Sequence, residues 1–225
     1  MDKKIKRIII VGGGTAGWMT AAAIVSMLPT DEISVTLVES EAIGIIGVGE
    51  ATLPHIRFFN ETIGIDEAEF MAATHATFKL GIEFVNWARI GDAYIHPFGA
   101  YGPAGGAVPF HQYWRKFADQ PDFSDIGDFS LPIKTAYAGK FGFPDDNPAS
   151  VLSTFGYAYQ FDATLYAPFL RNHAEKRGAT RIEGKVNGVH RDPERGDISG
   201  LDLSDGEHIN VDLFVEWSVF SGLFF

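Results

Sequence analysis

Three glycines near the N-terminus have the spacing of a turn that binds phosphate. Gly12, Gly14 and Gly17 form a G-x-G-x-x-G pattern, with Thr15 and Ala16 inside it. In such a turn the first glycine permits a tight bend, the second lets the backbone approach a pyrophosphate, and the third lets the next helix pack closely. The positive end of that helix faces the phosphates. The pattern therefore predicts a dinucleotide ligand.

The segments around the turn are those needed to position it. Residues 8–11 form a continuous apolar run, typical of a strand buried on both faces. Residues 15–28 are rich in alanine and end before Pro29, as expected of a buried helix. A second predicted strand, residues 33–38, ends at Glu39, about 20 residues beyond the glycines, where a ribose hydroxyl is expected. The alternative is a plain βαβ unit in which Glu39 has no ligand.

Composition limits the function classes. The 225 residues are enough for one large or two small domains, and the net charge of −11 argues against a broad nucleic-acid surface. No cysteine is present, so thiolate chemistry and iron–sulfur clusters are excluded. The histidines show no metal-ligand spacing, which predicts no metal site. No apolar run is long enough to span a membrane, and a cytoplasmic protein is expected.

The rest of the chain predicts a return to regular structure after a long insert. A short helix is expected near residues 66–73, a strand over 78–87 and an amphipathic helix over 162–176, with Asp162 as its N-cap. Residues 91–150 are rich in loops, prolines and aromatic residues, which favours an inserted region. The tail predicts strands over 181–189, 198–203 and 208–214, with a hairpin turn at residues 204–206.

Several motifs together resemble the flavin-dependent tryptophan halogenase family, in register along the whole chain. They are residues 12–19 (GGGTAGWM), 47–54 (GVGEATLP), 78–79 (FK), 84–87 (FVNW), 157–163 (YAYQFDA) and 212–215 (DLFV). The resemblance implies an α/β fold with a Rossmann-type FAD-binding unit and an insert on the substrate side. It divides the chain into 1–90 (βαβ unit, flavin loop and lysine strand), 91–156 (insert) and 157–225 (return to the FAD-binding domain).

The resemblance also implies the chemistry. Reduced FAD reacts with dioxygen to a flavin hydroperoxide, chloride or bromide converts this to hypohalous acid, and the oxidant travels along a tunnel to a lysine beside an indole-type substrate. This lysine corresponds to Lys79. Desolvation in an apolar strand would keep its amine partly neutral, so that it forms a haloamine or hydrogen-bonds the hypohalous acid. The alternative is a surface lysine on an edge strand.

Further cofactor contacts are implied by the same resemblance. Gly49, Glu50 and Ala51 correspond to the flavin-binding loop, although Glu50 also suits a helix N-terminus. Val186 corresponds to a residue near the adenine of FAD, and its alternative is a core valine. A separate flavin reductase is expected to supply FADH2, because no nicotinamide site is seen. The resemblance is compatible with a homodimer.

The chain departs from the family near its end. The family's W-x-W-x-I-P motif and the glutamate that works with the lysine would lie beyond residue 225, so the chain resembles the N-terminal portion of a longer fold. Val219 stands in place of a glycine, and Trp217 in place of a small residue, where overpacking is expected. Two alternatives to halogenation therefore stay open: an aromatic monooxygenase that does not need Lys79, and an inactive, truncated FAD-binding fragment.

Overall fold

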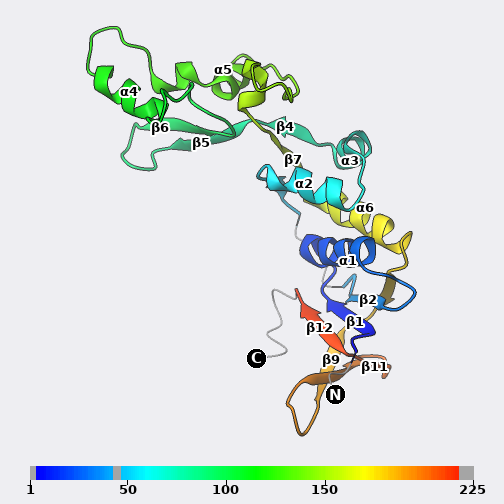
Figure 1. Cartoon of the computed structure of the whole chain (residues 1–225). Coiled ribbons are helices and arrows are strands. Elements are labelled where there is room, and N and C mark those ends of the chain that lie inside the picture. The colour runs from blue at the N-terminus through cyan, green and yellow to red at the C-terminus, as the bar shows by residue number, and fades with distance from the viewer. Residues whose placement is uncertain (1–3, 43–46, 218–225) are drawn as a thin grey trace. The chain divides into compact units, whose positions relative to one another are not determined.

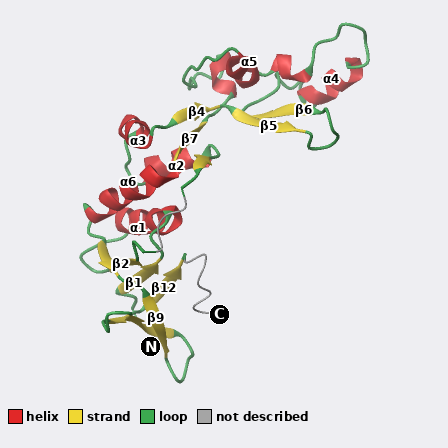
Figure 2. Ribbon diagram, turned by 180° about the vertical axis from the view of Figure 1, so that it is seen from behind, coloured by secondary structure: helices red, strands yellow, loops and turns green. Residues whose placement is uncertain are grey.

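The computed structural model describes residues 4–42 and 47–217, which divide into two compact units (Figures 1 and 2). Unit 1 comprises residues 1–50, 59–76 and 161–225. Unit 2 comprises residues 51–58 and 77–160. Both units therefore draw on separate stretches of the sequence, and the strand that carries Lys79 belongs to unit 2.

Unit 1 contains a parallel four-stranded sheet with the order β12-β1-β2-β8. Its strands are β12 (Leu213–Glu216), β1 (Arg7–Val11), β2 (Ser34–Glu39) and β8 (Thr180–Glu183). Helix α1 (Thr15–Met27) connects β1 to β2, which pair in parallel from Arg7 opposite Ser34 to Val11 opposite Val38. This confirms the predicted βαβ unit and the α/β fold class.

Both faces of this sheet are covered, which explains the unbroken apolar run in β1. On one face Ile9, Val11 and Val38 join a hydrophobic cluster with the buried side chains of the neighbouring antiparallel sheet. On the other face Leu37 lies against α1, within 3.5 Å of the Cβ position of Gly17. Because successive side chains of a strand point to opposite faces, a strand buried on both sides needs apolar residues throughout.

Two further helices complete unit 1. Helix α6 (Ala163–Glu175) lies beside α1 (Figures 1 and 2), and α3 (Glu67–Thr74) packs on α6. Phe70 of α3 is fully buried, with its ring centroid 5.3 Å from that of Tyr166. The predicted N-cap of α6 is confirmed, because the carboxylate of Asp162 accepts a hydrogen bond from the backbone N–H of Thr164 at 2.8 Å.

The N-cap of α3 gives a stability prediction. Asp66 Oδ1 accepts a hydrogen bond from the backbone N–H of Glu69 at 2.9 Å. Replacing Asp66 by Ala leaves that donor without its cap, and we expect a loss of about 1 kcal/mol in the free energy of unfolding. Urea denaturation measures the change. Asp66→Asn is the control, since an asparagine cap should retain most of the stability; equal losses in both variants would contradict the capping role.

An antiparallel three-stranded sheet with the order β11-β10-β9 packs on the parallel sheet, and we call it the meander. Its strands are β9 (Val186–Arg191), β10 (Ile198–Leu203) and β11 (His208–Asn210). The hairpin predicted at residues 204–206 is confirmed, with Gly206 at φ +93°. The single strand predicted over 181–189 is wrong: the chain leaves the parallel sheet after Glu183 and enters the meander at Val186.

Unit 2 is built on short antiparallel pairs. Strand β4 (Thr77–Lys79) pairs with β7 (Ala158–Asp162), and β3 (Gly49–Ala51), of which only Ala51 belongs to unit 2, lies on the other side of β7. Strand β5 (Gly81–Val85) pairs with β6 (Ala93–Pro97), so the strand predicted over 78–87 is interrupted at Leu80. The remaining elements of unit 2 are short helices: α4 (Phe110–Phe117), η1 (Ile126–Phe129), α5 (Leu131–Tyr137), η2 (Val151–Thr154) and the first half of α2 (His55–Thr62), whose residues 59–62 belong to unit 1.

Two expectations about the end of the chain have different outcomes. Trp217 is 48% exposed, and its indole N–H donates to the hydroxyl of Thr20 at 3.0 Å. The predicted overpacking at Trp217 is therefore wrong, because the side chain lies at the surface. Val219 lies outside the described residues.

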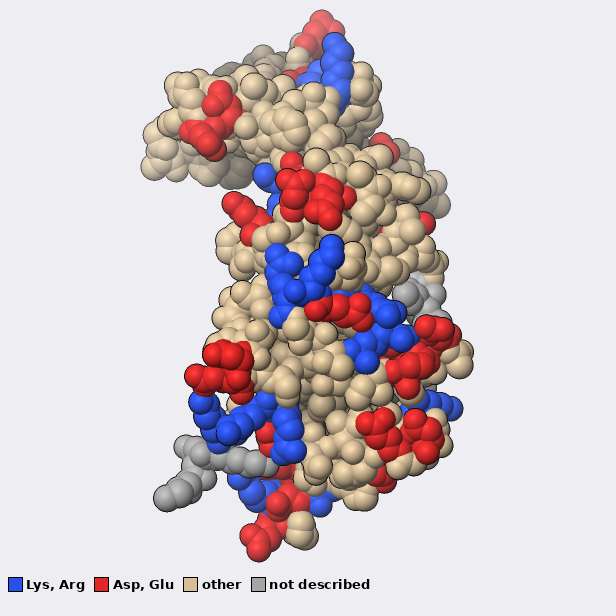
Figure 3. Space-filling view, turned by 90° about the vertical axis from the view of Figure 1, so that its right-hand side faces the viewer, with Lys and Arg blue, Asp and Glu red and all other residues tan. Residues whose placement is uncertain are grey.

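The face of the molecule shown in Figure 3 carries charged side chains of both signs. On the face shown in Figure 3, Lys and Arg side chains are interspersed with Asp and Glu, and a continuous basic surface is not seen there. In the described part of the chain, every helix is too short or too polar to cross a membrane.

Candidate functional site

The glycine turn has the geometry that its sequence predicts. Gly12 has φ +115°, a conformation that favours glycine, and its N–H donates to the carbonyl of Val38 at 2.9 Å. A Cβ atom built on Gly17 would lie 1.8 Å from the carbonyl oxygen of Gly12. The first turn of α1 therefore approaches the end of β1 so closely that a side chain at position 17 has no space.

The N-terminus of α1 is open at Gly14, and the nearest carboxylate, that of Glu39, lies beside Gly13. A Cβ atom built on Gly14 would have no neighbour within 4 Å. The N-cap is Gly14 itself, which has no side chain that could cap the helix. The first turn, which begins with Thr15 and Ala16, contains no acidic residue. Backbone N–H groups at an uncapped helix N-terminus bind anions. This open cradle fits the pyrophosphate of a dinucleotide such as FAD.

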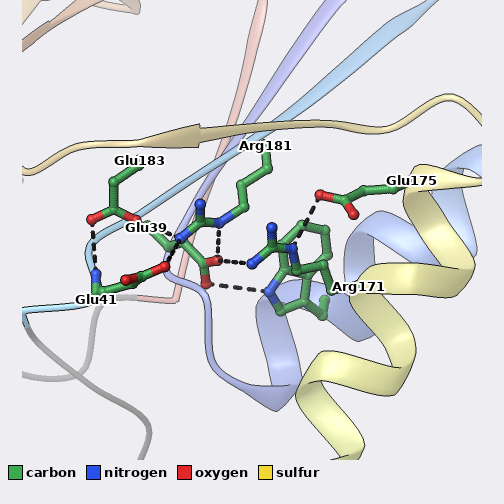
Figure 4. Close-up of polar contacts among 7 residues, drawn as sticks. Glu39, Glu41, Arg171, Glu175, Arg181 and Glu183 are labelled. Carbon is green, nitrogen blue, oxygen red and sulfur yellow. Dashed lines mark hydrogen bonds and ion pairs between the residues drawn. The ribbon is translucent and has the colours of Figure 1, made fainter.

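Glu39 lies at the centre of a charged network beside the turn (Figure 4). Its carboxylate accepts a hydrogen bond from Nε of Arg181 on β8, and Nη1 of Arg171 on α6 lies 3.8 Å from the same oxygen. The indole N–H of Trp18 donates to the other oxygen at 3.3 Å. Hydrogen bonding to Glu39 raises the pKa of the Arg181 guanidinium above its ordinary value. These contacts fix the carboxylate against the backbone of Gly13.

The network was only partly predictable. The sequence indicates Glu39 but not its cationic partners, which come from two later segments. Parallel pairing of β2 with β8 places Arg181 opposite Leu37, two residues before Glu39, and this register brings the guanidinium to the carboxylate. Arg181 also binds Glu41 at 3.1 Å and contacts Glu183. Each oxygen of Glu39 has further lone pairs, so the carboxylate can still accept a ribose hydroxyl.

The flavin-loop residues lie in or beside β3. A Cβ atom on Gly49 would have no neighbour within 4 Å, so the backbone is open there. Glu50 lies within β3, and helix α2 begins only at His55, so Glu50 is not at a helix N-terminus. Residues 43–46 of this loop lie outside the described residues.

Val186 lies in the core. Its side chain is 4% exposed and belongs to the hydrophobic cluster between the parallel sheet and the meander. Val186 is therefore a core valine, which is the alternative given in the sequence analysis. Its contact with adenine stays a prediction.

Lys79 is a buried lysine with a defined orientation. It is 8% exposed, at the end of β4, where it pairs with Ala158 of β7. Its Nζ donates to the carbonyl oxygen of Thr52 at 2.8 Å and lies 5.6 Å from the ring centroid of Phe98. Thr52 is itself fixed, because its N–H donates to the carbonyl of Tyr159 at 3.0 Å. The alternative of a surface lysine is therefore wrong.

The neighbouring residue packs on the opposite face of β4. The ring of Phe78 stacks on that of Phe141, with centroids 3.7 Å apart, and contacts Phe143 and Tyr157 edge-on. This aromatic cluster anchors the strand, so that the adjacent lysine has a fixed position. The sequence pointed to Phe78 and Lys79 themselves. It did not predict the aromatic partners of Phe78, which come from residues 141–157.

The sequence-predicted residues fall into two groups. Unit 1 holds the glycine turn, Glu39, Gly49, Glu50 and Val186, and unit 2 holds Ala51 and Lys79. Within unit 1 the structure brings Glu39 to the glycine turn. Within unit 2 it brings Lys79 to Thr52, the residue that follows Ala51.

The chain is similar to proteins of one family throughout. The family model for tryptophan halogenase matches residues 7–225. Tryptophan 6-halogenase ThaL of Streptomyces albogriseolus is 35% identical over 99% of this chain and 44% of its own length. The 7-chloro-L-tryptophan 6-halogenase KtzR of Kutzneria sp. is 37% identical over 96% of this chain and 45% of its own.

Solved structures give the same result. BrvH, a flavin-dependent halogenase from Brevundimonas sp., matches with a TM-score of 0.89 and 43% identity, over 98% of this chain and 44% of that one. Xcc4156, a flavin-dependent halogenase from Xanthomonas campestris, matches with a TM-score of 0.87 and 43% identity, over 94% of this chain and 42% of that one. The chain thus spans less than half the length of these relatives, and it belongs to the tryptophan halogenase family.

Proposed function

We propose that this chain contributes the cofactor-binding unit and the reactive lysine of an FADH2-dependent halogenase acting on an indole- or tryptophan-like ring. A separate flavin reductase supplies the reduced cofactor, and dioxygen and chloride or bromide are co-substrates. The relatives' names as tryptophan halogenases and flavin-dependent halogenases support the substrate class and the cofactor. The observation that carries the proposal is the buried, oriented Lys79.

Unit 1 supplies the FAD site in this proposal. The uncapped N-terminus of α1 binds the pyrophosphate, and the open backbone at Gly14 lets it approach. Glu39 accepts a ribose hydroxyl while Arg181 and Trp18 hold its carboxylate in place. When bound, reduced FAD would give two electrons to dioxygen, and the activated oxygen would oxidise halide to hypohalous acid, with the second oxygen atom released as water.

Unit 2 supplies the group that directs this oxidant. The Nζ of Lys79 keeps one hydrogen bond to the carbonyl of Thr52, which holds the amine in one orientation. Lys79 donates a hydrogen bond to the oxygen of hypohalous acid when the oxidant arrives, so that the halogen is presented to the aromatic ring. Burial of the lysine excludes water that would compete for this hydrogen bond.

Halide dependence tests the proposal. We would join this chain to the part of BrvH that it does not match, and supply FAD, a flavin reductase, tryptophan or indole, and bromide. A brominated product that disappears when bromide is omitted is the expected result, with intact BrvH as the positive control. An oxygenated product that ignores bromide would instead establish the monooxygenase. A soluble hybrid without turnover would establish the inactive fragment.

A further inference from the structure

Three side chains of metal-binding type converge on one exposed face of the meander. They are His190 on β9, Asp202 on β10 and His208 on β11. Nε2 of His190 lies 2.6 Å from Oδ2 of Asp202, and Nδ1 of His208 lies 2.7 Å from Oδ1. One potential ligand atom from each residue lies within 4.8 Å of the other two. We call this group the His–Asp–His cluster.

The register of the strands explains the convergence. Asp202 pairs directly with His208 of β11, and His190 of β9 pairs with Gly200, two residues before Asp202. Cross-strand partners and residues two apart in a strand share one face of a sheet. All three side chains therefore project from the same face, with Asp202 on the central strand.

Two glycines on this face leave space for the cluster. A Cβ atom on Gly200 would lie 2.7 Å from Cε1 of His208, so the imidazole ring lies over that backbone. A Cβ atom on Gly188, which pairs with Asp202, would lie 3.3 Å from Oδ2 of Asp202. Glycine inside a strand weakens the strand and often marks a close approach of another group. Here both glycines permit the rings and the carboxylate to converge.

We propose that the His–Asp–His cluster binds one divalent transition-metal ion, with zinc as the representative ion. Two imidazole nitrogens and one carboxylate oxygen are ligands that zinc accepts, and water completes the coordination. The side chains are 53%, 40% and 44% exposed, so an ion can enter from solvent. The bound ion would connect all three strands of the meander.

The electrostatics of the cluster suit a cation. Each oxygen of Asp202 contacts one imidazole nitrogen, so the one acidic side chain of the cluster is shared by both rings. In the absence of metal the two imidazoles share this carboxylate, and an ion would replace those hydrogen bonds with coordination. The sequence predicts no metal site because the three ligands, 12 and 6 residues apart, lie on three different strands and come together only through the register of the meander.

Titration of the whole chain with zinc chloride tests the proposal. We expect saturable binding of one ion per chain by calorimetry, and at least about tenfold weaker binding in each of His190→Gln, Asp202→Asn and His208→Gln. Cobalt absorption provides an independent readout of coordination. The matched control is His111→Gln, an exposed histidine in α4 outside the cluster, which should bind zinc like the parent chain.

Specific outcomes would overturn the site. These are parent-like zinc affinity in any one cluster variant, equal weakening in His111→Gln, or no saturable binding up to about 1 mM zinc. Circular dichroism verifies the folding of each variant. If Asp202→Asn does not fold, His190→Gln decides, because its side chain lies on the edge strand of the meander and is half exposed. Because this site is independent of FAD, neither result bears on the proposed halogenation.

Discussion

Gly17→Ala is expected to destabilise the chain by about 3 kcal/mol or more and to abolish FAD binding. The added methyl group would lie 1.8 Å from the carbonyl oxygen of Gly12, a backbone atom that cannot move away as a side chain does. Helix α1 would have to shift away from the end of β1, and the turn would lose its shape. Urea denaturation and flavin-fluorescence titration measure the two effects.

Gly14→Ala is the matched variant that separates the cofactor site from the fold. A methyl group at position 14 meets no atom within 4 Å, and the backbone there, with φ −71° and ψ 179°, is allowed for alanine. We therefore expect stability close to that of the parent chain. FAD affinity should still fall strongly, because the methyl group would occupy the space assigned to the pyrophosphate. Unchanged FAD affinity in a folded Gly14→Ala chain would show that the glycine turn is not part of the cofactor site.

Lys79→Ala is expected to abolish halogenation, by at least about a hundredfold in rate, and to leave FAD binding intact. The experiment uses the hybrid with BrvH described above. Without the Nζ donor, the hypohalous acid is not directed to the ring and should diffuse into the solvent. A halogen-trapping dye in the assay would detect it there. Lys79→Met should behave in the same way while retaining the apolar stem beside Phe98.

The control for Lys79 is Lys140→Met, because Lys140 is an exposed lysine of the same unit. Its halogenation rate should match that of the parent hybrid. Loss of FAD binding together with halogenation in both Lys79 variants would show that the lysine is structural. Full halogenation in Lys79→Met would show that its amine has no part in the reaction.

The sequence by itself determined the local elements of the cofactor unit. The spacing of Gly12, Gly14 and Gly17, the apolar strand before them and the carboxylate after the second strand all rest on short-range constraints. Backbone freedom, strand alternation and helix capping act within a few residues, so composition and spacing reveal them. For the same reason the N-cap Asp162 was predictable.

Only the tertiary structure decided which distant residues complete each site. Arg181 reaches Glu39 through parallel pairing of strands far apart in the sequence, and Thr52 orients Lys79 from another segment. The same holds where the chain changes sheets, after Glu183, and where the meander gathers His190, Asp202 and His208. These arrangements depend on strand register and on burial against other elements. A sequence pattern carries no direct record of either, because both arise only when separate segments pack together.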